Sequence, residues 1–112
     1  MLARRYRLTK RDNIPAILKK GGMFMSKPLV IRFQKNNLDH HRFGAIVSQK
    51  IDSKAVNRNR VRRQIYEVLR LNYEQFPSDS HFDILILPKK AIIESTYPEI
   101  QDAILSLMPK LK

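Results

Sequence analysis

Arginine is concentrated in one segment of the sequence, and its guanidinium group can bind a phosphate with two parallel hydrogen bonds, which lysine cannot do. Residues 54–70 carry six cations and one anion, Glu67. This composition indicates contact with a polyanion, above all with the phosphates of nucleic acid. A solvated basic face is the alternative, since most charge runs are of that kind. The candidate nucleic-acid-binding residues are Lys54, Arg58, Asn59, Arg60, Arg62, Arg63 and Arg70.

The same segment has the period of an amphipathic helix. We predict an uninterrupted helix over residues 54–72, with Asp52 or Ser53 as its N-cap. One side of this helix is apolar and is formed by Val61, Ile65, Val68 and Leu69. A polar sector away from the centre of that side is formed by Asn59, Arg63, Tyr66 and Arg70. The arginines are therefore expected to face away from the protein core.

Charge is distributed unevenly along the chain, whose formal net charge is +12. Residues 1–66 carry 17 cations and 3 anions, whereas residues 67–112 carry 5 cations and 7 anions. Nucleic acid is the favoured partner, because each phosphate contact releases counterions. An anionic membrane surface is the competing partner, but no segment pairs a basic face with a bulky apolar face. We therefore expect no membrane contact.

The cellular compartment is indicated only indirectly. The chain has no cysteine, which fits a reducing compartment. Its cationic start is not followed by the apolar stretch of a secretory signal, and no apolar run is long enough to span a bilayer. These features favour a cytoplasmic location.

The chain length fits one domain, so residues 1–112 are expected to form a single domain. Strands are predicted at residues 22–26, 29–33, 43–48 and 82–87, with further helices over residues 12–20 and from Thr96 or Tyr97 to about Leu111. Asp12 or Asn13 can cap the first of these helices, and Gly21 can end it. This order of elements indicates an α+β sandwich, with helices packed against a small sheet.

The sequence lacks the residue sets of protein-based catalysis. It contains no Ser/His/Asp arrangement, no metal-ligand spacing and no glycine-rich phosphate loop. His40 and His41 are expected in a surface loop, His81 in a structural role, and Asp83 at a sheet edge or in a salt bridge. We therefore predict no catalytic residue, no metal ligand and no small-molecule substrate.

The residues from Ala55 to Arg63, AVNRNRVRR, resemble the "RNR" signature of the ribonuclease P protein family. Features that align with the family in order, over about residues 4–108, are Arg7-Leu8, Gly21, the segment Gly44 to Ser48 with Lys50, the segment Asp83 to Lys90, and the segment Tyr97 to Ile100. A chance match of one motif would not reproduce this order.

The resemblance implies an αβββαβα fold with a four-stranded sheet. It also implies a function as the protein subunit of ribonuclease P, a ribonucleoprotein endonuclease that removes the 5′ leader from precursor tRNA. In that family the RNA subunit performs the cleavage with magnesium ions, so no cofactor is expected on the protein alone. The implied partners are ribonuclease P RNA, which meets the arginine helix, and precursor tRNA.

The resemblance further implies a cleft for the leader between the first helix and the sheet. Its candidate residues are Ile14, Leu18, Val30, Arg32 and Tyr66. Strand alternation independently turns Val30 and Arg32 away from the core, because Leu29, Ile31 and Phe33 share the other face.

The first helix departs from the family, whose members commonly carry aromatic residues there. Aromatic stacking contributes about 1–3 kcal/mol per base, and the aliphatic Ile14 and Leu18 cannot supply it. These two residues are either leader contacts of a different kind or ordinary core residues.

A ribosomal or other structural RNA-binding protein is the second candidate function, because it shares the charge and the lack of catalytic groups. It would not explain the ordered motifs. A DNA-binding regulator is less favoured, since no helix-turn-helix pair precedes the basic helix. A protein-only nuclease would need clustered carboxylates for magnesium, and residues 1–66 contain only three.

Overall fold

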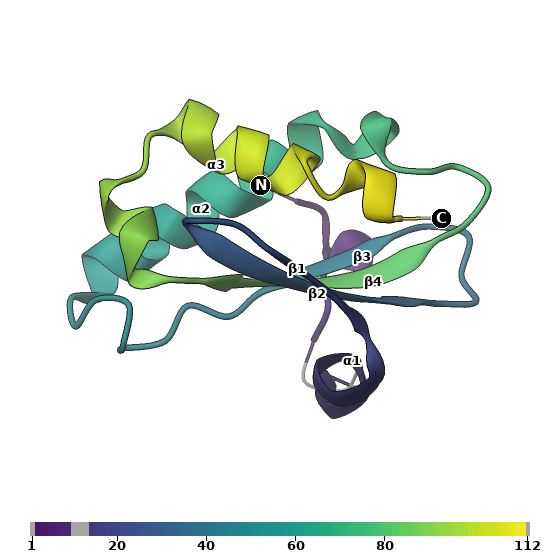
Figure 1. Ribbon diagram of the computed structural model, residues 1–112, viewed down its shortest axis with the longest axis horizontal. Coiled ribbons are helices and arrows are strands. Elements are labelled where there is room, and N and C mark those ends of the chain that lie inside the picture. Colours follow the sequence, from purple (N-terminus) through teal and green to yellow (C-terminus); the bar gives the residue numbers. More distant parts are fainter. Residues whose placement is uncertain (1, 10–13, 112) are drawn as a thin grey trace.

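A four-stranded sheet organises the computed structural model, which describes residues 2–9 and 14–111. The strands lie in the order β1-β2-β4-β3 (Figure 1). β1 pairs with β2 and β2 with β4 in antiparallel fashion, whereas β3 and β4 are parallel. The strand bounds are Gly22–Met25 for β1, Leu29–Lys35 for β2, Arg42–Ala45 for β3 and Phe82–Pro88 for β4.

Helices cover both faces of this sheet. α2 (Ala55–Leu71) and α3 (Tyr97–Leu105) lie on one face, and α1 (Ile14–Lys20) lies on the other (Figure 1). Short 3-10 helices are η1 (Arg4–Tyr6), η2 (Tyr73–Gln75), η3 (Lys90–Glu94) and η4 (Met108–Lys110). The predicted α+β order of elements is confirmed. No helix within the described residues is long and apolar enough to cross a membrane.

The main core lies between the sheet and the α2–α3 layer. Leu29 and Ile31 of β2 are fully buried there, as the two-residue period of a strand predicts. Ile31 lies opposite Ile86 of β4 in the sheet register. The predicted apolar side of α2 is also fully buried, and each such side chain contributes about 1.5–3 kcal/mol on burial. Because the apolar side of α2 faces the core, the arginines of this helix lie on its outward side.

The N-terminal segment pairs with the outer edge of β3 through a parallel bridge between Arg7 and Phe43. The backbone N–H of Leu8 donates to the carbonyl oxygen of Phe43 at 2.7 Å. A Cβ atom on Gly44 would lie 3.0 Å from Leu85 and 3.3 Å from Leu8. A side chain at position 44 would therefore crowd the side chains of Leu85 and Leu8, which gives a physical reason for the motif residues Leu8 and Gly44.

Two helix caps test the sequence predictions. Thr96 caps α3 in a reciprocal capping box with Glu99, which agrees with the predicted start of this helix at Thr96 or Tyr97. The predicted cap of α2 is wrong, because Lys54 occupies the N-cap position without a side-chain cap. The carboxylate of Asp52 instead accepts a hydrogen bond from the Lys54 N–H at 2.8 Å. Asp12 and Asn13, the candidate caps of α1, lie outside the described residues.

Several element boundaries differ from the predicted ones. The predicted strand 43–48 spans only residues 42–45, and the last α-helix ends at Leu105 before the 3-10 turn at Met108–Lys110. Asp83 forms the predicted salt bridge, with its carboxylate 2.7 Å from Arg42. Its predicted edge position is wrong, since β4 lies between β2 and β3.

His41 is a core residue, so the predicted surface position is wrong. Its exposed fraction is 1%. The Phe82 N–H donates to Nδ1 at 3.0 Å, and Nε2 donates to the carbonyl oxygen of Pro77 at 2.7 Å. Burial lowers the pKa of His41 below 6.5, which favours the neutral imidazole that this hydrogen-bond pattern requires. His40 is half-buried and contacts Tyr6.

Candidate nucleic-acid interface

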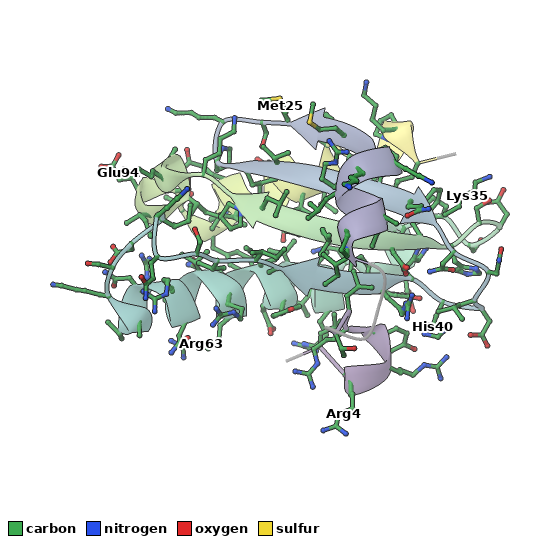
Figure 2. The ribbon with its side chains drawn as sticks, turned by 90° about the horizontal axis from the view of Figure 1, so that it is seen from below. Arg4, Met25, Lys35, His40, Arg63 and Glu94 are labelled. Carbon is green, nitrogen blue, oxygen red and sulfur yellow. The ribbon has the colours of Figure 1, made fainter. Side chains whose placement is uncertain are left out.

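The outward side of α2 carries the predicted cationic surface. Asn59, Arg63 and Arg70 are exposed, and Lys54 is exposed at the helix start. The remaining candidates, Arg58, Arg60 and Arg62, are half-buried. Figure 2 shows Arg63 pointing away from the sheet. The rigid helix thus presents a row of guanidinium groups that can contact successive phosphates.

The arginines of α2 differ in what they bind within the protein. Arg58 donates to the carbonyl oxygens of Asp52 and Ser53, both at 2.9 Å, and so braces the loop before the helix. Arg62 donates to Oδ1 of Asn59 at 2.8 Å. Arg70 forms an ion pair with Glu67. These three guanidinium groups must share their donors between the protein and a ligand.

Arg60 and Arg63 are different, because neither has a hydrogen bond or ion pair to any residue that the structure describes. Their donors are therefore open to phosphate oxygens without loss of an internal contact. We expect these two residues to carry the largest share of phosphate binding by α2.

The Glu67–Arg70 ion pair lowers the net charge at the C-terminal end of α2. The Arg70 guanidinium lowers the pKa of the Glu67 carboxyl, and Glu67 raises the pKa of Arg70. Both groups are solvent-exposed, so the pair adds little stability. Its main effect is to neutralise the only anion among the arginines of α2.

Tyr66 does not belong to this outward sector, so the predicted position is wrong. Its exposed fraction is 7%, and it lies in the main core. The Ala45 N–H donates to the Tyr66 hydroxyl at 3.3 Å. The reason is that β3 is an edge strand, whose outward N–H needs a partner that a long side chain from α2 can reach. Tyr66 therefore has little surface to offer a leader beside Val30 and Arg32.

The sheet face that carries α1 is partly open. Val30 lies between Met25 and Leu87 in the register, so these three side chains form a row across the sheet. Met25 is 56% exposed, and Ile46, just after β3, is 41% exposed. Figure 2 shows α1 lying across this face, with Met25 toward one edge of the sheet. The row, here called the apolar row, comprises Met25, Val30, Leu87 and Ile46.

Arg32 lies on the same face but is bound to α1. Its guanidinium donates to the carbonyl oxygens of Leu18 and Gly21. Leu18 lies in the last turn of α1, where carbonyl groups have no partner within the helix and cations are favoured, and Gly21 directly follows the helix. Arg32 therefore fastens α1 to β2 at the border of the apolar row.

Comparisons with known proteins identify the family that carries this arrangement. A family model described as Ribonuclease P matches residues 2–112. This chain belongs to the ribonuclease P protein family. The ribonuclease P protein component of Alkaliphilus metalliredigens (strain QYMF) is 37% identical over 106 residues, which cover 95% of this chain and 93% of that protein. The component of Thermotoga maritima is 31% identical and covers 97% of this chain and 94% of that protein.

Solved structures of ribonuclease P proteins have the same fold. The Thermotoga maritima protein matches with a TM-score of 0.83 and 29% identity, over 95% of this chain and 97% of that chain. The Staphylococcus aureus protein matches with a TM-score of 0.79 and 27% identity, over 94% and 93% of the two chains. The resemblance drawn from the RNR signature is confirmed. As a ribonuclease P protein, this chain is an RNA-binding subunit of an endoribonuclease that processes the 5′ end of tRNA.

The predicted leader residues of this ribonuclease P protein fall into three groups according to their position in the structure. Val30 and Arg32 lie on the face of α1, as predicted. Leu18 is 39% exposed, so the core alternative is wrong for this residue, and Ile14 is half-buried. Ile17 is the buried residue of α1, at 2% exposed. Tyr66 lies in the core on the other side of the sheet.

Most of the apolar row was not predicted from the sequence. Met25 belongs to the short strand β1, and Leu87 belongs to a nearly continuous apolar run. The pairing register brings both beside Val30. The exposed methionines at positions 23 and 25 alternate with Phe24, and this two-residue pattern was the available signal.

No group of three or more His, Cys, Asp or Glu residues among residues 2–9 and 14–111 could hold a metal ion. His40 meets the ring of Tyr6 edge-on, and His41 stacks with Phe82. The outward side of α2 and the sheet face beside α1 carry cations, amides and apolar side chains.

Proposed function

We propose that this ribonuclease P protein binds two RNA elements with opposite sides of its sheet. The outward side of α2 binds ribonuclease P RNA, and the open face beside α1 binds the 5′ leader of precursor tRNA. The observation that supports this proposal most strongly is the placement of α1 and α2 on opposite sheet faces. Two RNA strands can then be bound without competing for the same side chains.

The α2 surface suits a structured RNA. Arg60 and Arg63 offer guanidinium groups without internal partners among the described residues, and Arg58 and Arg62 are held in place by their own hydrogen bonds. A rigid row of cations favours a backbone of fixed geometry, as in a folded RNA. Counterion release then supplies much of the binding free energy.

The apolar row suits a single strand. Unpaired bases can lie against Met25, Val30 and Leu87, while the phosphates of the strand stay in contact with water. Aliphatic contact lacks the stacking that aromatic side chains give, which is about 1–3 kcal/mol per base. The leader is therefore held by shape and apolar contact, and its sequence is read only weakly.

We assign the hydrolysis itself to the RNA subunit and its magnesium ions. The protein contributes binding and orientation of the substrate, and holds no cofactor of its own. Its place of action is the cytoplasm, where precursor tRNA is available to the ribonucleoprotein.

The test is reconstitution of precursor-tRNA cleavage at low magnesium concentration. The protein is added to ribonuclease P RNA, and the rate of release of the 5′ leader is measured. We expect cleavage to depend on both components, with none from the protein alone. Cleavage by RNA-free protein, or no stimulation of the RNA subunit, would overturn the proposal.

Two double variants distinguish the effect of losing the α2 cations from the effect of a lower net charge. Arg60→Gln with Arg63→Gln removes two cations from α2, and Lys90→Gln with Lys110→Gln removes two from η3 and η4. Only the first pair is expected to weaken RNA binding strongly. A structural RNA-binding protein, the second candidate, would bind RNA through the same cations but would leave cleavage unstimulated.

A further inference from the structure

A hollow on the α2 surface is lined by two residues with buried polar atoms that have no partner among the residues that the structure describes. Its volume is about 260 Å³, and it is lined by Arg60, Arg63, Gln64, Glu67 and Tyr97. The first four residues come from α2, and Tyr97 is the first residue of α3. The hollow therefore lies where the two helices meet, within the cationic surface described above.

Oε1 of Gln64 and the hydroxyl of Tyr97 are buried and have no hydrogen-bond partner in the part of the chain that the structure describes. Such groups are rare, because a buried polar atom without a partner costs about 1–3 kcal/mol. An amide oxygen only accepts hydrogen bonds, whereas a phenol can donate one and accept others. A ligand for both must therefore donate a hydrogen bond to Gln64, and it can either accept one from Tyr97 or donate one to it.

Phosphate alone does not meet this requirement. Its oxygens suit the guanidinium groups of Arg60 and Arg63, but they would repel the Gln64 Oε1 atom, and Glu67 adds a second acceptor nearby. The Watson–Crick edge of an unpaired adenine or cytosine carries an amino donor beside a ring-nitrogen acceptor, and that of guanine carries an amino donor beside an N–H donor. Proteins recognise RNA by binding such unpaired bases on these edges.

We propose that this hollow holds one unpaired nucleobase of ribonuclease P RNA. The amino group of the base donates to Gln64 Oε1, and the Tyr97 hydroxyl bonds the neighbouring ring atom. Arg60 and Arg63 bind the phosphates on either side of that nucleotide. This inference rests on the proposed binding of ribonuclease P RNA by α2, and it adds base recognition to phosphate contact.

The variants that test it remove hydrogen-bonding groups without changing charge. Tyr97→Phe removes only the hydroxyl, and Gln64→Met replaces the amide by an apolar group of similar length. We expect each to weaken binding of ribonuclease P RNA about three- to tenfold, with an unchanged salt dependence. The thermal unfolding temperature should stay the same or rise, since an unsatisfied buried group is lost.

Tyr73→Phe is the matched control, because it removes a hydroxyl that does have a protein partner. The His41 N–H donates to this hydroxyl at 2.9 Å. We expect this variant to lower the unfolding temperature and to leave RNA affinity unchanged. If Tyr97→Phe behaves like this control, with a lower unfolding temperature and unchanged RNA affinity, then the Tyr97 hydroxyl is satisfied within the protein. That result would overturn the proposal.

Chemical probing supplies a direct readout of the base. Dimethyl sulfate and kethoxal modify the Watson–Crick edges of unpaired adenine, cytosine and guanine. In the wild-type complex, one nucleotide of the RNA subunit should be protected, and it should become reactive in the Tyr97→Phe, Gln64→Met double variant. If the wild-type protein binds the RNA but no such nucleotide is found, the base site is wrong and the proposed function stands. If the wild-type protein does not bind the RNA, both are wrong.

Discussion

The guanidinium group of Arg32 in β2 donates a hydrogen bond to the carbonyl oxygen of Leu18, at the C-terminal end of α1. A second bond to the carbonyl oxygen of Gly21 fixes the same end of the helix. A Cβ atom on Gly21 would lie 2.5 Å from the carbonyl oxygens of Ile17 and Phe33, so the chain passes too close to β2 for any side chain there. The position of α1 beside the apolar row is thus set by β2.

Arg32 is therefore expected to act on the leader through α1. Arg32→Ala should weaken binding of leader-bearing precursor tRNA to the reconstituted holoenzyme by about tenfold, or about 1.4 kcal/mol. Binding of mature tRNA should not change, because that product has no leader. Hydrogen exchange should also accelerate in α1. Equal losses for both tRNAs, or no loss for either, would show that this face does not hold the leader.

The arginines of α2 should separate into two classes. Replacing both Arg60 and Arg63 by Gln should flatten the salt dependence of RNA binding by at most about two units of slope, with little change in stability. Arg58→Ala should instead lower the unfolding temperature, because Arg58 braces the carbonyls of Asp52 and Ser53. Titrations over a range of salt, combined with thermal unfolding, measure both effects. A common phenotype for all three residues would contradict this division.

Stability should fall as the pH drops below about 6.5, because of His41. Burial lowers its folded-state pKa, so protons bind more readily to the unfolded chain. The stabilisation is complete above the unfolded pKa and is lost as the pH falls through the folded pKa. The slope approaches about 1.4 kcal/mol per pH unit at most. His41→Gln should be less stable at pH 7.5 and should lose this slope, whereas His40→Gln should keep it. Unfolding free energies between pH 5 and 7.5 that are the same in all three proteins would refute the assignment.

Asp83 should matter for stability and not for chemistry. Its carboxylate accepts hydrogen bonds from Arg42 and from Asn36, at 2.7 to 2.9 Å. Asp83→Ala removes an acceptor from both side chains and should cost about 1–3 kcal/mol of unfolding free energy. Cleavage by the holoenzyme at a temperature where the variant remains folded should be normal. A loss of cleavage rate without a loss of stability would indicate a catalytic carboxylate.

Local patterns in the sequence were sufficient for the order of elements. The helical period of Val61, Ile65 and Leu69 and the strand alternation of Leu29 and Ile31 depend only on neighbouring residues. The outward side of α2 follows from the same period. The Thr96–Glu99 capping box is also a local signal, but only the start of this helix at Thr96 or Tyr97 was predicted.

Long-range partners were not visible in the sequence. Tyr66 is buried because the N–H of Ala45 needs its hydroxyl, and His41 is buried because Phe82 and Pro77 bond its ring. All three partners lie more than twenty positions away. The hydrogen bonds of Arg32 to α1 likewise depend on how the helix crosses the sheet.

Crosslinking tests the two-sided arrangement most directly. A precursor tRNA with photoreactive nucleotides in its leader and a ribonuclease P RNA with photoreactive nucleotides are each assembled with the protein, and the crosslinked peptides are identified by mass spectrometry. The leader should crosslink to peptides of β1, β2 and α1, which include Met25, Val30 and Leu18, and the RNA subunit should crosslink to the peptide around Arg60 and Arg63. Leader crosslinks on α2, or RNA-subunit crosslinks on the apolar row, would contradict the central claim that the two RNAs bind opposite sides of the sheet.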